Sequence, residues 1–355
     1  MKPIYLIFSL LTFISLSCTS KDDTDLKENH DAQNIYFPPL DSDTWETKTP
    51  SELQWNTSAL AELSSFLENT NTKSFIILHK GKIAFEQYFN DHALTDPWYW
   101  ASAGKTLTST VTGIAQDQGL LDISSKVSDY LGTNWTSETL EQEQLITCQN
   151  LLSMDSGLDD SLGDSVAPEN LQYIANASNR WAYHNVYVKL QDVVAAVSNQ
   201  SWSDYFNENL KNKIGMTGTW ITIGDLSVYW STTRSMARFG LMIYANGQWD
   251  NQQIVSDAFL NQATNTSQSI NGYLWWLNGK SSYHLPQTQV EFTGELIPNG
   301  PSDMYCALGK NDQKLYIVPS KDLVIVRMGE AADDSNFALS SYDNALWEKL
   351  NNVYN

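Results

Sequence analysis

The feature of this 355-residue chain that could do chemistry is a serine followed three residues later by a lysine, Ser102 and Lys105. Leu107, Val111 and Ile114 follow at helical spacing, which predicts a helix that begins near Ser102. Residues three apart share a helix face, so the hydroxyl and the amine are expected side by side. The free amides at that helix end favour an alkoxide, and burial would leave the lysine partly neutral and able to accept the serine proton. The spacing predicts nucleophilic catalysis, although a capping serine beside a solvated lysine has the same spacing.

A second candidate is the triplet Tyr183-His184-Asn185, in a loop before a predicted helix over 186–197. A phenol beside a cationic lysine would have its pKa lowered toward the phenolate, so Tyr183 is expected to act as a general base. Asn185 is expected to hold Lys105 or a substrate carbonyl with its amide, and His184 to face solvent. A half-buried loop aromatic is the alternative interpretation of Tyr183.

Together, Ser102-x-x-Lys105 and Tyr183-x-Asn185 resemble the signature of the serine hydrolases of the class C β-lactamase superfamily. That group includes penicillin-binding D,D-peptidases, carboxylesterases and nylon-oligomer hydrolases. Other stretches that match the family pattern are 145–158, 230–240 and 315–326. The resemblance covers about 50–350. It implies a two-lobed, β-lactamase-like α+β fold, and a serine hydrolase of the nylon-oligomer hydrolase or carboxylesterase branch that needs no metal or organic cofactor.

The third motif of this family is a Lys- or His-x-Gly on the strand that lines the cleft. The best match is Ala307-Leu308-Gly309, where alanine stands in the place of the cation. With this alignment, the resemblance implies an oxyanion hole made by the backbone N–H groups of Ser102 and Lys310. A backbone donor does not depend on its side chain, so acyl transfer can survive the change, whereas recognition of a substrate carboxylate is in doubt. A second possible match is Phe-Thr-Gly at 292–294.

The elements that must position these residues are strands near both ends of the chain and helices between them. Two strand-like runs around a Gly-containing turn predict a hairpin over 74–88, and a second pair predicts another over 314–327. A helix is expected over 336–350, and the pattern over about 103–270 is mostly helical.

The hydrolase domain is therefore expected over 49–355, which is long enough for two lobes. One sheet, made from both termini and flanked by helices, would form an α/β lobe from about 49–100 and 271–355. A helical lobe from about 101–270 would be inserted into it, with the catalytic cleft between the two lobes.

Residues 1–17 combine a lysine, an apolar run and a small residue before Cys18, which predicts an export signal too short to span a bilayer comfortably. The junction resembles a lipoprotein lipobox and implies lipid attachment at Cys18 after secretion across the inner membrane. An ordinary signal peptide with an incidental cysteine is the alternative. The polar segment 18–48 is expected to be a flexible tether that holds the protein at the cell envelope, with its lipid in the outer membrane. A periplasmic and a surface-facing orientation are both compatible with this tether.

Composition narrows the function classes further. The net charge of −20 argues against nucleic-acid binding, which needs a basic face, and five histidines without ligand spacing make zinc unexpected. Cys148 and Cys306 are expected as two buried thiols, although an oxidising compartment would permit them to pair. The expected function is cleavage of an ester or amide bond of a small molecule through an acyl-enzyme at Ser102. A D,D-peptidase, or a catalytically weak surface binding protein of the same fold, is the alternative.

Overall fold

The computed structural model describes residues 34–265, 272–334 and 337–354. Its centre is a six-stranded antiparallel sheet with the strand order β2-β1-β13-β12-β11-β8. In that order the strands are Lys82–Tyr88, Thr72–His79, Leu323–Gly329, Gln313–Val318, Tyr305–Gly309 and Trp276–Leu277. Both predicted hairpins are confirmed as β1–β2 and β12–β13, and the first and last parts of the chain meet in the pair β1–β13.

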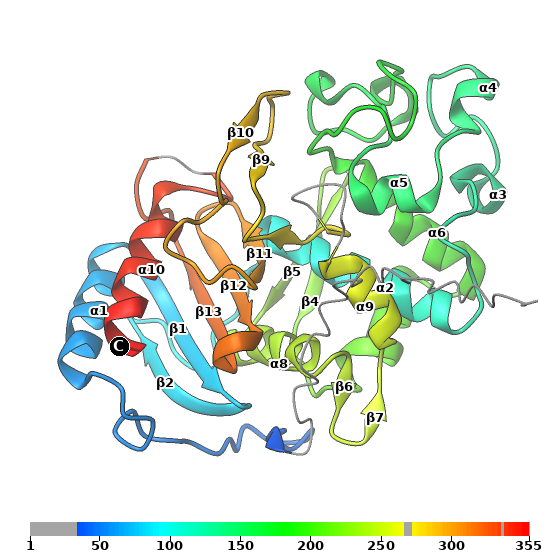
Figure 1. Cartoon of the computed structure of the whole chain (residues 1–355). Coiled ribbons are helices and arrows are strands. Elements are labelled where there is room, and N and C mark those ends of the chain that lie inside the picture. The colour runs from blue at the N-terminus through cyan, green and yellow to red at the C-terminus, as the bar shows by residue number, and fades with distance from the viewer. Residues whose placement is uncertain (1–33, 266–271, 335–336, 355) are drawn as a thin grey trace, which may run out of the picture.

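The sheet is buried on both faces because its inner strands alternate between two apolar cores. Phe75 and Ile77 of β1 belong to a core shared with α1 (Thr57–Asn69) and α10 (Ser341–Tyr354). Ile76 belongs to the core on the opposite face, which α8 (Thr233–Tyr244) covers. Figure 1 shows α1 and α10 side by side on the sheet, with the remaining helices beyond the opposite face. A continuous apolar run in β1 is what burial on both faces requires.

The remaining helices form the helical lobe around α2 (Lys105–Asp117), whose residues are buried from Lys105 through Ala115. Helices α6 (Lys189–Ser198) and α9 (Asp257–Thr264) pack against α2. At Gly113 an added Cβ would lie 2.4 Å from the Phe259 ring, so α9 approaches α2 as closely as a glycine permits. The α-helices of this lobe not yet described are α3 Val127–Leu131, α4 Leu140–Glu143, α5 Cys148–Ser153 and α7 Trp202–Phe206.

Three small sheets complete the described part of the fold, and one of them leads directly to Ser102. Its order is β3-β5-β4, and its edge strand β3 ends two residues before Ala101. Its strands are β3 Trp98–Tyr99, β4 Thr219–Ile223 and β5 Leu226–Ser231. The other two are the hairpins β6 Gln248–Trp249 with β7 Gln252–Gln253, and β9 Ser282–His284 with β10 Glu291–Thr293.

Several boundaries differ from the sequence predictions. The described part of the predicted tether, 34–48, packs on the domain: Trp45 is buried and donates its indole N–H to Gly81 O at 2.7 Å. Its aromatic residues give this segment enough apolar surface to bind the domain. Helix α8, predicted in the helical lobe, covers the sheet, and the C-terminal helix begins five residues later than predicted.

Cys148 and Cys306 are free, buried thiols that lie in different cores. Cys18 and the predicted signal segment lie outside the described residues. Within the described ranges, no helix combines the length and the apolar character that crossing a bilayer requires.

Candidate active site

Ser102 lies in a tight 3₁₀ turn, Ala101–Gly104, that joins β3 to α2. Trp100 fixes the entry to this turn: its backbone N–H donates to Tyr229 O at 2.9 Å, and its buried indole N–H donates to Ser231 Oγ at 2.7 Å. Ala101 has a φ of +48°, which a non-glycine residue adopts only when its surroundings impose it. The predicted helix start is therefore confirmed, with Ser102 on a strained turn just ahead of the helix.

Lys105 lies against Ser102, as the spacing predicts. Its Nζ donates to Ser102 Oγ at 2.9 Å, and it lies 4.8 Å and 4.5 Å from the ring centres of Tyr183 and Tyr187. The side chain is only 4% exposed. Burial lowers the pKa of Lys105 to about 7, although Asp164 acts in the opposite direction. A large share of the amine is therefore neutral near pH 7 and can accept the serine proton.

Tyr183 also reaches the pair, but in a protonation state opposite to the predicted one. Burial raises the pKa of Tyr183 to about 12, with the nearby Ser102 hydroxyl acting the other way. The predicted phenolate is wrong because desolvation outweighs the one effect that lowers the pKa of Tyr183, the contact with the Ser102 hydroxyl. The Lys105 amine lies over the face of the Tyr183 ring. The Tyr183 hydroxyl is buried and forms no hydrogen bond of good geometry within the described structure. It is a neutral phenol, close to Ser102 and able to donate or relay a proton.

The two residues after Tyr183 differ from expectation. His184 is buried, not solvent-facing: its Nδ1 accepts the Val186 N–H at 3.3 Å and caps the short 3₁₀ turn Asn185–Val188, and burial lowers its pKa. Asn185 does not hold Lys105. Its amide donates to the carboxylate of Asp164 at 3.0 Å.

The third motif comes from β11, which ends beside the 3₁₀ turn. At Gly309 an added Cβ would lie 2.3 Å from Trp100 O and 3.1 Å from Ala103 N, so this backbone touches the nucleophile's turn. Lys310, the next residue, lines the same cleft as Ser102. Ala307 does not line it, because its side chain is buried in the core. The alternative motif at 292–294 lies at β10 and is not among the cleft residues.

The cleft that these elements enclose has a volume of about 350 Å³. Sequence analysis missed three of its polar residues, Asp160, Asp164 and Tyr187, because no motif spacing marks them. The Asp160 carboxylate is paired with Arg180 at 2.6 Å. The residues that line the whole cleft are Ala101, Ser102, Lys105, Asp160, Gly163, Asp164, Tyr183, His184, Asn185, Tyr187, Leu226, Ser227, Val228, Pro286, Gln287, Lys310, Phe337 and Ala338.

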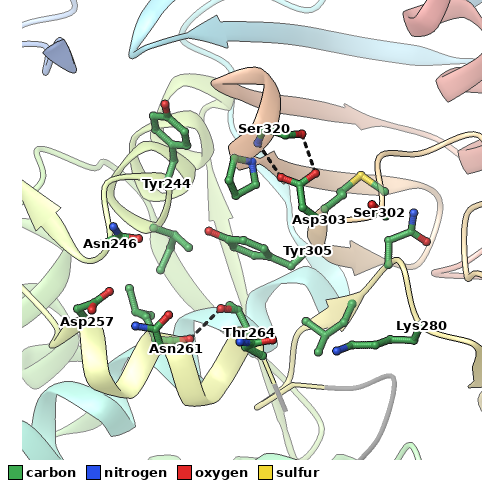
Figure 2. A pocket seen from close by; sticks show the side chains of 17 residues that line it. Tyr244, Asn246, Asp257, Asn261, Thr264, Lys280, Ser302, Asp303, Tyr305 and Ser320 are labelled. Carbon is green, nitrogen blue, oxygen red and sulfur yellow. Dashed lines mark hydrogen bonds between the residues drawn. The ribbon is translucent and has the colours of Figure 1, made fainter. Parts of the chain in front are cut away.

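A second cavity, of about 340 Å³, lies at the opposite end of β11 (Figure 2). The ring of Tyr305 stands in its middle among polar side chains, and Asp303 accepts hydrogen bonds from the Ser320 N–H and hydroxyl. Ser102, Lys105 and Tyr183 do not line it. The candidate active site is therefore the first cavity.

A family model described as Beta-lactamase matches residues 67–339. The chain belongs to the β-lactamase family. No curated protein matches it in sequence.

Among solved structures, a candidate 6-aminohexanoate-dimer hydrolase from Bacillus anthracis has a TM-score of 0.68 at 18% identity, with 91% of both chains covered. A class C β-lactamase from Rhodobacter sphaeroides has a TM-score of 0.61 at 15% identity, covering 83% of this chain and 99% of that one. An octameric penicillin-binding protein homologue from Pyrococcus abyssi has a TM-score of 0.59 at 14% identity, and the match covers 83% of this chain and 77% of that one. At these identities the neighbours establish the two-lobed α+β fold.

In this β-lactamase-family site, Asp164 is expected to set the pH at which Lys105 becomes a base. The carboxylate raises the lysine pKa toward its ordinary value, while burial lowers it. The rate of acylation in the parent protein should rise with pH through about 7 and then level off. Asp164→Asn removes the negative charge, so the midpoint should move to lower pH. A pH profile of kcat/KM for both proteins is the measurement, and a midpoint that moves upward would contradict the assignment.

Gly309→Ala tests the contact between β11 and the 3₁₀ turn. The new methyl group would lie within 2.3 Å of Trp100 O, so one backbone must move, and overpacking of this kind costs about 1–3 kcal/mol. We expect a lower melting temperature and a kcat reduced roughly tenfold or more, because the reacting groups shift. Gly113→Ala is the control: it forces a similar overlap with Phe259 away from the cleft, and should lower stability while kcat stays near its parent value.

Proposed function

We propose that this protein hydrolyses an ester or amide bond of a small molecule through a covalent acyl intermediate on Ser102. The observation that carries the proposal is the 2.9 Å contact between the Lys105 amine and the Ser102 hydroxyl, in a cleft where burial brings the lysine pKa to about 7. A nucleophile, a matched base and a pocket of ligand size are the minimum for acyl transfer.

In the proposed reaction, the neutral Lys105 amine takes the proton of Ser102 as Oγ attacks the substrate carbonyl. The N–H groups of Ser102 and Lys310 stabilise the resulting oxyanion. When the carbon–heteroatom bond breaks, the lysine ammonium returns the proton to the leaving alcohol or amine. Tyr183, a neutral phenol, relays that proton. Water then attacks the acyl ester and gives up its proton by the same route, which regenerates Ser102.

We further propose that the acyl part of the substrate lacks a carboxylate. Ala307 stands where the family motif has a cation and is buried, so it cannot bind such a group. The carboxylate of Asp164 also lines the cleft, with no cation within 4.0 Å among the described residues, and would repel an anion. Lys310 is the one exposed cation of the cleft lining. Uncharged acyl groups, such as those of esterase or linear-amide substrates, fit this charge pattern better than penicillins.

The experiment is covalent labelling of the purified protein with a fluorophosphonate and, separately, with a fluorescent penicillin. The adduct is located by peptide mass spectrometry. An adduct at Ser102 with the fluorophosphonate alone supports the esterase or amidase assignment. Adducts with both reagents favour a D,D-peptidase. Absence of both would overturn the proposal and leave a binding protein of the same fold. Turnover of p-nitrophenyl esters, small linear amides and nitrocefin then defines the substrate class.

A further inference from the structure

The turn that follows β11 places two consecutive residues in the left-handed region of the backbone, and it lies close to the turn of Ser102. Lys310 lines the cleft, and the next two residues, Asn311 and Asp312, have φ values of +61° and +59°. Left-handed backbone is uncommon outside glycine and costs on the order of 1 kcal/mol per residue, although Asn and Asp tolerate it best. Two such residues in succession match the pattern of a type I′ turn between the hairpin strands β11 and β12. The hydrogen bonds to the turn show which groups hold it in place.

The group that holds it is a buried arginine two strands away. Arg327 of β13 is 0% exposed, and its Nη1 donates to Asp312 O at 2.8 Å and to Asn311 O at 3.3 Å. Each remaining N–H group of the guanidinium also has a hydrogen-bond acceptor. Its other N–H groups donate to Thr70 O at 2.7 Å, Glu330 O at 2.9 Å and Thr72 Oγ1 at 3.1 Å. Five contacts match the five N–H donors of arginine, so the side chain has no rotational freedom left.

The arginine is unusual because its acceptors carry no net charge. No carboxylate lies within 4.0 Å of it among the described residues, although the Tyr342 ring faces the guanidinium at 4.8 Å. A buried cation without a counter-ion is costly, and neutral carbonyls offset only part of that cost. Stability alone is therefore a poor explanation for Arg327. Fixing five carbonyl and hydroxyl groups in one geometry is what a planar, rigid fork does best.

Three further contacts connect the same turn to β13 and to the strand that precedes Ser102. Gln313 donates its amide to Asn311 O at 2.9 Å and to Gly329 O at 2.6 Å, which joins the turn to the end of β13. On the cleft side, the Asn311 amide donates to the hydroxyl of Tyr99 at 2.7 Å. Tyr99 lies three residues before Ser102, so the turn is held between the arginine and the strand that leads to the nucleophile.

We propose that Arg327 is a positioning residue for hydrolysis: its guanidinium holds the turn 310–312 so that the Lys310 N–H faces the oxygen of the carbonyl group attacked by Ser102. This inference rests on the proposed function. It predicts that weakening the clamp lowers kcat and leaves substrate binding and the protonation of Lys105 unchanged, because an oxyanion donor acts on the transition state.

Arg327→Lys is the test variant, because it keeps the charge and loses the fork. Arg238→Lys is the matched control: Arg238 is also buried and donates to backbone carbonyls, those of Ile214, Pro39 and Ser42, but does not line the cleft. We expect Arg327→Lys to lower kcat about 10- to 100-fold, with KM within about threefold and the midpoint of the pH profile still near 7. The Arg238 variant should lose comparable thermal stability and keep kcat within about twofold.

A kcat within twofold of the parent in folded Arg327→Lys would overturn the proposal, as would equal losses of kcat in both arginine variants. Where Arg327→Lys does not fold, Tyr99→Phe takes its place. It removes one contact to the turn, and an unchanged kcat in that variant counts against positioning. Hydrogen exchange of the peptide 305–313 measures the clamp without turnover and should speed up in Arg327→Lys but not in Arg238→Lys. A parent protein without turnover or labelling would refute the proposed function, whereas unchanged exchange would refute the clamp.

Discussion

Ser102→Ala should abolish fluorophosphonate labelling and lower ester hydrolysis by a factor on the order of 10⁴ or more, because within the described structure Ser102 carries the cleft hydroxyl that the Lys105 amine contacts. The fold should be retained. Ser102 lies on a short turn whose position is fixed by the buried Trp100 and by α2, and alanine fits the same backbone. Melting temperature and far-UV circular dichroism are the measurements of folding.

Ser109→Ala is the control for that experiment. Ser109 lies in α2, the helix that follows the turn of Ser102, and is fully buried without a hydrogen-bond partner for its hydroxyl among the described residues. The control should label and turn over like the parent. Labelling that persists in Ser102→Ala, with a new adduct site, would assign the nucleophile elsewhere.

Lys105→Met should have two opposite effects. Loss of the base should lower kcat by about 10²- to 10⁴-fold. Stability should rise, because burial lowers the pKa of the lysine to about 7 from its ordinary value of 10.5. The unfolded chain then binds the proton more strongly than the native protein, which destabilises the native state. That penalty is complete below about pH 7 and fades as pH rises toward 10.5, so the gain from methionine should be greatest at acidic and neutral pH.

Lys314→Met provides the contrast. Lys314 is also fully buried, but it contacts two carboxylates, Asp343 at 2.6 Å and Asp312 at 3.1 Å. Removing its amine leaves both acids uncompensated, which should lower stability by about 3–5 kcal/mol. Chemical denaturation of the two variants between pH 6 and pH 9 is the measurement. A loss of stability in Lys105→Met at pH 6 would contradict the assigned state of the catalytic lysine.

Local patterns carried most of what the sequence predicted correctly. Ser102 and Lys105 are three residues apart, so one turn of helix brings them together whatever the rest of the chain does. The hairpins β1–β2 and β12–β13 are equally local, since short polar turns separate their apolar runs. The arrival of Tyr183 beside this pair depends on the whole fold, and only the family resemblance predicted it.

The errors and omissions involve long-range contacts. Tyr183 was expected as a phenolate because its burial could not be read from the triplet. His184 was expected in solvent because nothing in the letters shows that its ring caps a buried turn. Asp164 raises the pKa of Lys105 from a loop that carries no recognisable motif. Arg327 belongs to an apolar strand, and the sequence alone does not indicate a function for it.

The pairing of β1 with β13 also bears on how this protein acquires activity during synthesis. Thr72 and Gly329 are partners across the sheet, so the ribosome has to deliver almost the entire chain before the central strand finds its neighbour. Contacts this distant in sequence slow folding and leave strand edges exposed meanwhile. Nascent chains that end before residue 310 would carry the Ser102 motif yet lack the turn at 310–312, so under the proposed function we expect them to be inactive.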